Sequence, residues 1–169
     1  HDNQDGTEGL GETCATAYFI RVLDELIRME QNSFYGDLME RAIYNGLFAA
    51  QSPDGRRLRY YVPFDGERVF FDKDTYCCAC NYRRIVPELP SMLYYRMDGG
   101  IAVNLYVPSQ ATIDLQDGTK VQIQQKTDYP NSGVIDLDIN PASPNSFPLR
   151  VRIPRWCEEG TVSVNDEEI

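Results

Sequence analysis

The sequence predicts an α+β protein in two parts, in which helical hairpins are followed by an antiparallel β-sandwich. Apolar residues recur at helical spacing through the first half of the chain. After Gly99-Gly100 they alternate with polar residues over short segments. Turn residues separate these segments at regular intervals, as in antiparallel sandwiches. We therefore expect one part over residues 1–98 and another over residues 99–169, each needing further chain to complete its core.

Two helices are expected at the start of the first part. The first runs from about Thr13 to Glu30, with Thr13 as a candidate N-cap, and Asn32-Ser33 ends it. The second follows Asp37 and ends at the turn residues 52–55. The two helices should pack as an antiparallel hairpin.

A third helix is expected just after the cysteines at 77–80, with apolar side chains pointing inward as far as Tyr95. Pro87 and Pro90 lie inside that pattern, so we expect a kink or a late start. Between the second and third helices, a small hairpin is expected with its turn at Asp65-Gly66. Its two extended segments are 58–62 and 69–71. Strands of the second part are expected at 101–107, 112–115, 120–123, 134–139, 149–153 and 161–164.

Composition excludes some classes of function. The 169 residues include 26 acidic and 16 basic side chains, for a net charge of -10, which argues against a nucleic-acid binder. No apolar run approaches the roughly 20 residues of a membrane-spanning helix, so we expect a soluble protein with no membrane partner. The chain has no initiating Met and resembles a segment of a longer protein. Its free thiols slightly favour the cytoplasm, whereas an upstream signal would direct secretion, so the compartment stays unassigned.

The five cysteines are the residues that most clearly suggest chemistry. Adjacent cysteines rarely bond to each other, so Cys77 and Cys78 favour a thiolate cluster over a disulfide framework. Glu12 and Cys14, two residues apart in an extended segment, would point the same way and supply oxygen and sulfur ligands to zinc. The alternatives are a Cys-x-x-Cys site that includes Cys80, or cysteines that are simply buried apolar side chains.

Cys77 has a further property, because it lies at the predicted start of a helix. The helix dipole and the unpaired amides there stabilise a thiolate, and a bound cation would do so further. Cys77 is therefore a candidate nucleophile.

Several motifs together resemble glycoside hydrolase family 127, a family typified by β-L-arabinofuranosidases. They occur in the family's order and approximate spacing over nearly the whole chain: Gly11-Glu12-Thr13-Cys14-Ala15, Glu40-Arg41-Ala42-Ile43-Tyr44-Asn45, Tyr60-Tyr61-Val62-Pro63, Cys77-Cys78-Ala79-Cys80-Asn81, Asn104-Leu105-Tyr106-Val107 and Arg152-Ile153-Pro154-Arg155-Trp156. The resemblance implies that residues 1 to about 97 are the last part of an (α/α)6 barrel. It also implies that the remainder is the β-sandwich that follows the barrel.

The resemblance implies roles for six positions. The zinc ligands would be Glu12, Cys14, Cys77 and Cys78. Cys77 would also be the nucleophile of a retaining glycosidase that acts on furanosides of plant-type glycans. Glu40 and Tyr60 would line the sugar pocket, with a solvated helix face and a core aromatic as the alternatives.

The sequence departs from the family in two ways. Cys80 stands where characterised members often have proline, so it competes as a metal ligand or only packs. The family's general acid/base glutamate lies further upstream than this chain reaches, and Glu8 does not match it. Because leaving-group protonation contributes about 100- to 10,000-fold, we expect the segment alone to be a poor catalyst.

The expected partners are a carbohydrate substrate and the rest of the parent chain. Binding of these partners leaves room for a homo-oligomer. The rival hypothesis is a non-catalytic module, in which zinc ties helices together or the sandwich binds glycan. Trp156 and the pair Tyr94-Tyr95 are candidate sugar-stacking residues, but core positions are favoured for them.

Overall fold

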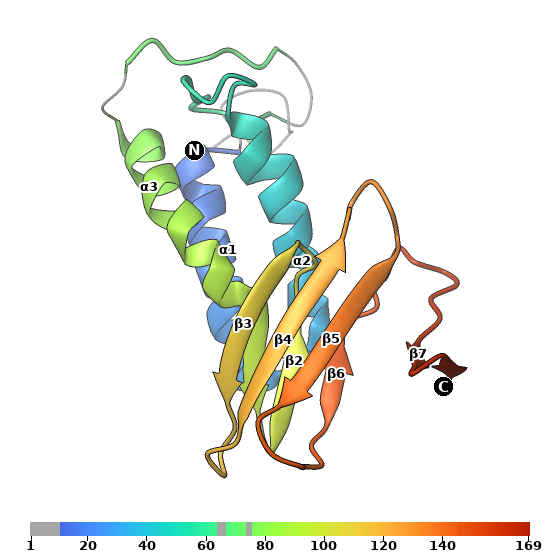
Figure 1. The fold of residues 1–169 in the computed structure, drawn as a ribbon. Coiled ribbons are helices and arrows are strands. Elements are labelled where there is room, and N and C mark those ends of the chain that lie inside the picture. The colour runs from blue at the N-terminus through green and yellow to red at the C-terminus, as the bar shows by residue number, and fades with distance from the viewer. Residues whose placement is uncertain (1–10, 64–66, 74–75) are drawn as a thin grey trace.

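The computed structural model describes residues 11–63, 67–73 and 76–169, which form three packed helices and a set of small sheets (Figure 1). Helix α1 spans Thr13–Glu30, α2 spans Ser33–Ala42 and α3 spans Cys77–Ile85. Helix α1 packs against both of the others. The prediction of a mixed α and β protein is confirmed at this level.

Helix α1 matches its predicted span, although its N-cap residue is Glu12 and not Thr13. Helix α2 begins earlier than the expected Asp37. Asn32 was expected to help end the first helix, and instead it caps the second. Its side chain accepts a hydrogen bond from the backbone N–H of Phe34 at 3.0 Å, which satisfies one of the free amides of that helix. The α2 axis continues through a π-helical turn at Ile43–Leu47 and a 3-10 turn at Phe48–Ala50.

The predicted hairpin between α2 and α3 is only partly formed in the described residues. A single antiparallel bridge joins Arg59 to Phe70, and another joins Tyr61 to Glu12 just before α1. The expected turn at Asp65-Gly66 lies outside the described residues. The segment 58–62 therefore lies against the start of α1.

The third helix ends sooner than the apolar pattern predicted. Helix α3 stops at Ile85 and continues as a 3-10 helix over Val86–Met92, because Pro87 and Pro90 cannot donate the hydrogen bonds of an α-helix. Tyr95, which we expected on this helix, instead lies in strand β1 (Tyr94–Met97). The expected kink is therefore a change of helix type followed by a strand.

Two three-stranded sheets make up most of the second part. One has the order β1-β2-β6, with β2 at Gly100–Val103 and β6 at Leu149–Val151. The other has the order β3-β4-β5 and is antiparallel throughout, with strands Ser109–Asp114, Lys120–Thr127 and Ile135–Pro141. A short pair, β7 (Ser163–Val164) and β8 (Glu167–Glu168), follows near the end of the chain.

The pairing of β2 with β6 corrects one expectation. These strands are parallel, with Ile101 opposite Leu149, whereas we expected only antiparallel neighbours. The long connection through β3, β4 and β5 allows the chain to return in the same direction. Strand β2 also ends at Val103 and not at Val107, because the following residue turns toward the helices: the Asn104 amide donates to the carbonyl of Met92 at 3.0 Å.

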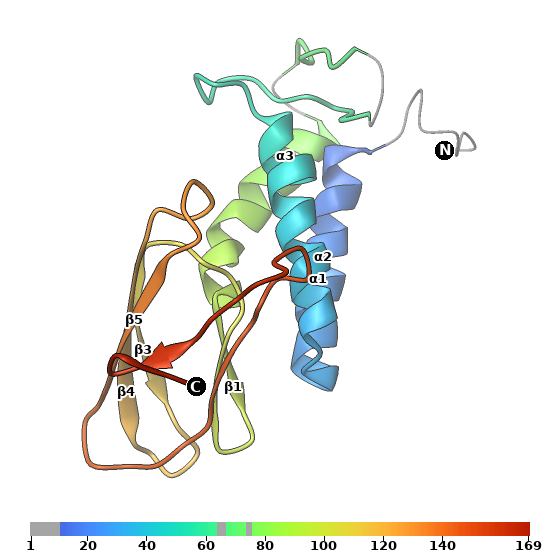
Figure 2. The same cartoon turned by 90° about the vertical axis from the view of Figure 1, so that its right-hand side faces the viewer.

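Two apolar clusters hold these elements together. The larger lies among the helices and also takes in Tyr95 and Leu105 from the second part. The smaller lies between the two three-stranded sheets, which Figure 2 shows side by side. In this cluster Ile101 packs with Val121 and Ile123. The change of pattern at Gly99-Gly100 thus falls at the β1–β2 hairpin, where Gly99 is in the turn and Gly100 begins β2. Among the helices of the described segments, none has the length and apolarity needed to cross a membrane.

Candidate functional site

Three cysteine thiols converge where α1 and α3 begin. Cys14 lies in the first turn of α1, and Cys77 and Cys78 open α3; Figure 1 shows these two helix ends next to each other. The Cys77 sulfur is 3.9 Å from each of the other two sulfurs, and all three lie within 4.8 Å of one another. Cys77 is exposed, Cys14 is half-buried and Cys78 is buried. The cluster is therefore open to solvent on the Cys77 side.

The spacing of the three sulfurs suits a metal ion. At zinc–sulfur bonds of about 2.3 Å in a tetrahedron, two ligand sulfurs lie roughly 3.8 Å apart, close to the 3.9 Å found here. Glu12 adjoins the group through Cys14, with 3.1 Å between the Cys14 sulfur and the carboxylate oxygen Oε2. The donor set of three sulfurs and a carboxylate is one that zinc accepts.

Tyr60 connects the cluster to the segment between α2 and α3. Its hydroxyl lies 3.2 Å from the Cys77 sulfur. Its backbone carbonyl accepts the amide of Thr13 at 3.0 Å and the thiol of Cys78 at 3.6 Å. The Tyr60 ring stacks on Tyr76, with 5.7 Å between centroids. Tyr60 is thus half-buried and held against both helix starts, with its hydroxyl beside the Cys77 sulfur.

The protein environment distinguishes the three thiols. The Tyr60 hydroxyl, as a hydrogen-bond donor, lowers the pKa of Cys77. Burial, reinforced by the Glu12 carboxylate, raises the pKa of Cys14, and burial also raises the pKa of Cys78. In the absence of a cation, Cys77 is therefore the thiol most easily deprotonated.

Asn81 supports the cluster from within α3. Its side-chain amide donates to the carbonyl of Cys77 at 3.0 Å, and the residue is buried. Two features of the sequence point to this residue: Asn81 ends the family motif that begins at Cys77, and the spacing of four residues places both on one helix face. Cys80 is half-buried and does not belong to the close group of sulfurs, and Glu8 lies outside the described residues.

Glu40 lies in a different environment. It is buried in the last turn of α2, where its Oε2 accepts from Arg152 at 2.5 Å and its Oε1 from the Tyr129 hydroxyl at 2.8 Å. Trp156 donates to the same Oε1 from its indole nitrogen at 3.3 Å. Glu40 is thus no solvated helix residue, and none of these contacts brings it to the thiols.

The core expectation holds for Tyr95, holds in part for Tyr94, which is half-buried against both apolar clusters, and fails for Trp156. Tyr95 is buried, and its hydroxyl donates to Asp24 at 2.6 Å. Trp156 is 62% exposed, because it lies on the segment after β6 that runs up to α2 rather than between sheets (Figure 2). The strand predicted at 149–153 from alternating apolar and polar residues ends at Val151. The residues after Val151 are therefore not in a strand that would point them into the core.

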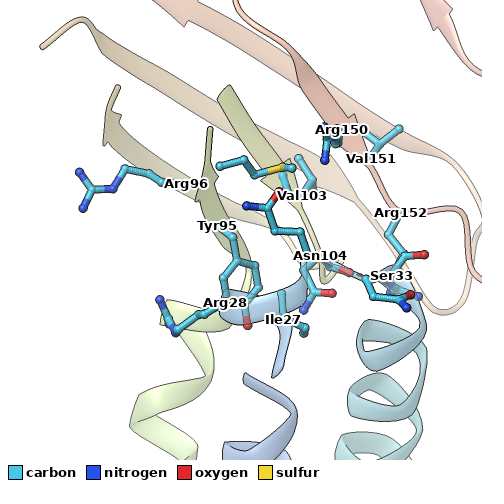
Figure 3. Close-up of a pocket in the computed structure, with 14 residues that line it drawn as sticks. Ile27, Arg28, Ser33, Tyr95, Arg96, Val103, Asn104, Arg150, Val151 and Arg152 are labelled. Atoms are coloured by element: carbon cyan, nitrogen blue, oxygen red, sulfur yellow. Dashed lines mark hydrogen bonds between the residues drawn. The ribbon is translucent and has the colours of Figure 1, made fainter. Parts of the chain in front are cut away.

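A cavity of about 380 Å³ lies between the end of α1, the start of α2 and the β1-β2-β6 sheet (Figure 3). Tyr95 and Asn104 line it, together with Arg28 and Arg150. The Arg28 guanidinium lies 5.1 Å from the centre of the Tyr95 ring. No cysteine of the thiol cluster lines this cavity, so it is separate from the candidate metal site.

Comparison with known proteins gives matches over nearly all of the chain. Residues 2–91 match the model of the β-L-arabinofuranosidase GH127 catalytic domain, and residues 100–169 match the model of the GH127 middle domain. A non-reducing end β-L-arabinofuranosidase from Bifidobacterium longum subsp. longum is 27% identical over 174 residues, covering 92% of this chain and 26% of that protein.

Solved structures agree with these matches. A GH127 β-L-arabinofuranosidase from Geobacillus stearothermophilus T6 superposes with a TM-score of 0.83 at 29% identity, covering 94% of this chain and 27% of that one. A GH127 β-arabinofuranosidase superposes with a TM-score of 0.82 at 28% identity, covering 94% and 28%. The chain thus spans about a quarter of the length of these relatives. The two family models together account for almost every described residue, and the chain belongs to glycoside hydrolase family 127.

Proposed function

We propose that this chain is the nucleophile-bearing part of a zinc-dependent retaining glycosidase of the β-L-arabinofuranosidase type. The observation that carries the proposal is the convergence of three thiols with Cys77 outermost, at the start of a helix and within reach of Tyr60. The relatives that match this chain are named as β-L-arabinofuranosidases, which supports a furanosidic substrate.

The metal would be held by Glu12, Cys14, Cys77 and Cys78. The sulfur spacing fits, and Glu12 is already beside Cys14. When bound, zinc would keep its thiol ligands deprotonated and so maintain the nucleophile. In this proposal Cys80 packs near the site without binding the metal.

The reaction would proceed in two displacements. The Cys77 thiolate attacks the anomeric carbon, the glycosidic C–O bond breaks, and the leaving oxygen takes a proton from a general acid. Water then attacks the same carbon from the opposite side and gives its proton to the conjugate base, and the thiolate is released. Two inversions leave the configuration retained. The general acid/base would come from a part of the longer protein outside this chain.

Tyr60 would orient Cys77 and contact the sugar, as its hydroxyl already reaches the sulfur. The contacts of Glu40 support a different role, in which it holds the segment after β6 against α2. We therefore propose Glu40 as a structural residue near the helix–sheet boundary.

Alkylation mapping would test the assignment of the nucleophile. The chain, with zinc and after removal of zinc by a chelator, is treated with iodoacetamide and each cysteine is quantified by mass spectrometry. We expect Cys77 to be modified first and zinc to protect the cluster, with Cys157 as an internal control of unchanged reactivity. Uniform protection of all three cluster cysteines in the metal-free chain would instead support a purely structural site.

A further inference from the structure

A second concave surface lies where α2 faces two segments of the β-rich part. The cavity there has a volume of about 720 Å³. Phe34 and Tyr44 line its helical side, and Tyr129 and Trp156 line the opposite side. None of the clustered cysteines belongs to its lining, so this surface is separate from the site of the proposed reaction.

Tyr129 and Trp156 form an aromatic shelf in this cavity. Their rings stack on each other, with an interplanar angle of 22° and 6.4 Å between centroids. The indole is 62% exposed although it is among the largest apolar side chains of the chain. Flat aromatic faces of this kind offer an apolar surface, while the polar tips of the rings bond elsewhere. The shelf can therefore cover the apolar face of a flat ligand.

The shelf is held in place by buried charges. The Glu40 carboxylate accepts hydrogen bonds from both the Tyr129 hydroxyl and the Trp156 indole nitrogen. Arg152 pairs with the same carboxylate, and both charged residues are buried, at 6% and 4% exposure for Glu40 and Arg152. Burial raises the pKa of Tyr129, which keeps its phenol protonated as the donor. The rings are thus oriented before any ligand arrives, which reduces the entropy cost of binding.

Polar groups surround the shelf. Arg41, Asn45 and Arg155 line the cavity and are exposed, so their guanidinium and amide groups can reach hydroxyls of a ligand. A cavity of this size with an aromatic floor and a few polar groups has the character of a small-molecule site. The acids of the lining, Asp37 and Glu40, are paired with the buried Arg152. The exposed polar groups of the lining therefore include the hydrogen-bond donors of Arg41 and Arg155, and hydroxyl oxygens of a ligand can accept from them.

We propose that this cavity is a second carbohydrate site, in which the exposed Trp156 indole, backed by the half-buried Tyr129, stacks on a ring of a neutral oligosaccharide. The choice of carbohydrate among flat, hydroxyl-rich ligands rests on the proposed glycosidase function. The site would hold a glycan chain apart from the sugar that reacts at Cys77, and so would favour polymeric over small substrates.

The chain contains a single tryptophan, Trp156, so its fluorescence reports on this cavity alone. Emission is recorded while arabinan-derived oligosaccharides are added to the protein and to a Cys77→Ser variant. We expect a saturable change in emission with the same affinity in both, because Cys77 does not line the cavity.

Variants that retain the reporter locate the site. Tyr129→Ala should weaken binding roughly tenfold, since it removes half of the shelf. Asn45→Ala changes an exposed residue of the rim and is compatible with folding, and it should weaken binding severalfold. The matched control is Tyr18→Ala, an aromatic residue of α1 with 55% exposure, which should bind as the unmodified protein does. Circular dichroism verifies that each variant is folded.

Several results would overturn the proposal. The first is that no oligosaccharide changes the emission. The second is that Tyr129→Ala and Asn45→Ala both bind with unaltered affinity. The third is that the emission change is lost in Cys77→Ser. An emission change that follows protein concentration without any sugar would assign the surface to self-association. A retained signal together with hydrolysis independent of Cys77 would refute the proposed function and leave this site intact.

Discussion

The three clustered thiols differ because each has different neighbours. Cys78 is enclosed, Cys14 faces the Glu12 carboxylate, and Cys77 is exposed next to the Tyr60 hydroxyl. A thiolate at Cys77 is therefore favoured, whereas the raised pKa values of the other two thiols mean that, without a bound cation, they lose their protons only at higher pH. This division matches a site in which two sulfurs serve mainly to hold a metal and the third also reacts.

The metal site gives the first prediction. The protein prepared under reducing, chelator-free conditions should contain close to one zinc per chain, measured by elemental analysis. Cys14→Ala should lose the metal and unfold at a much lower urea concentration, because metal binding is coupled to folding. Cys80→Ser is the control, and it should keep the zinc and unfold at an unchanged urea concentration. Loss of zinc in the Cys80 variant would replace the proposed ligand set with a Cys-x-x-Cys site.

The hydrogen bond between Tyr60 and Cys77 gives the second prediction. In the metal-free protein, Tyr60→Phe removes the donor that lowers the pKa of Cys77, so the pKa should rise and less thiolate should be present at a given pH. The pH dependence of Cys77 alkylation, followed by mass spectrometry, should shift toward higher pH. Tyr82→Phe, which removes a hydroxyl bonded to Gln51, is the control and should leave the curve unchanged.

At the scale of elements, the sequence pattern predicted those helices and hairpins that depend on residues close together in the chain. The α1 span follows from its apolar spacing, and the β3–β4 hairpin follows from Asp117-Gly118, where the glycine adopts φ +84°. The parallel β2–β6 pair could not be predicted in this way, since Ile101 and Leu149 meet only through tertiary packing. The same limit holds for the site: Cys14 and Cys77 are 63 positions apart, and no local pattern brings them together. Their proximity was predicted from the ligand chemistry of zinc and from the family resemblance.

The contact between α2 and the segment after β6 gives the third prediction. Arg152 pairs with Asp37 at 2.8 Å and with Glu40 at 2.5 Å, and all three are buried. Arg152→Leu would leave two buried carboxylates unpaired, so the free energy of unfolding should fall by about 3–5 kcal/mol.

The control for this measurement is the pair formed by Arg21 and Glu88, which is bidentate but partly exposed. Arg21→Leu should change the free energy of unfolding by about 0–1 kcal/mol in the same urea titration. Equal effects of the two substitutions would show that burial of the Arg152 pairs does not hold α2 to the β-rich part.

At the scale of the whole molecule, the two predicted parts share a core. Tyr95 and Leu105 pack among the helices, and β1 pairs with β2 across Gly99. Helix α1 also exposes apolar side chains, among them Phe19 at 45%, Val22 at 53% and Met29 at 77%. Residues 1–98 expressed alone should therefore associate and show poor solubility in light scattering, because they lose the partner of β1 and keep these exposed faces. A stable, monodisperse helical part would contradict the expectation that it belongs to a larger barrel.

The last prediction concerns catalysis by the 169-residue chain compared with a protein of the relatives' full length. In the longer protein, Cys77→Ser should abolish turnover of an aryl arabinofuranoside and leave much of the fold, because a neutral hydroxyl attacks far more slowly than a thiolate. The chain alone, with zinc bound, should show turnover near background, because the proposed general acid lies outside it and its absence costs about 100- to 10,000-fold. The absorbance of the released aryl group measures turnover by the longer protein and by the chain alone. Robust turnover by the chain alone would assign proton transfer to one of its own acids, and retained activity in Cys77→Ser would limit the thiols to holding structure.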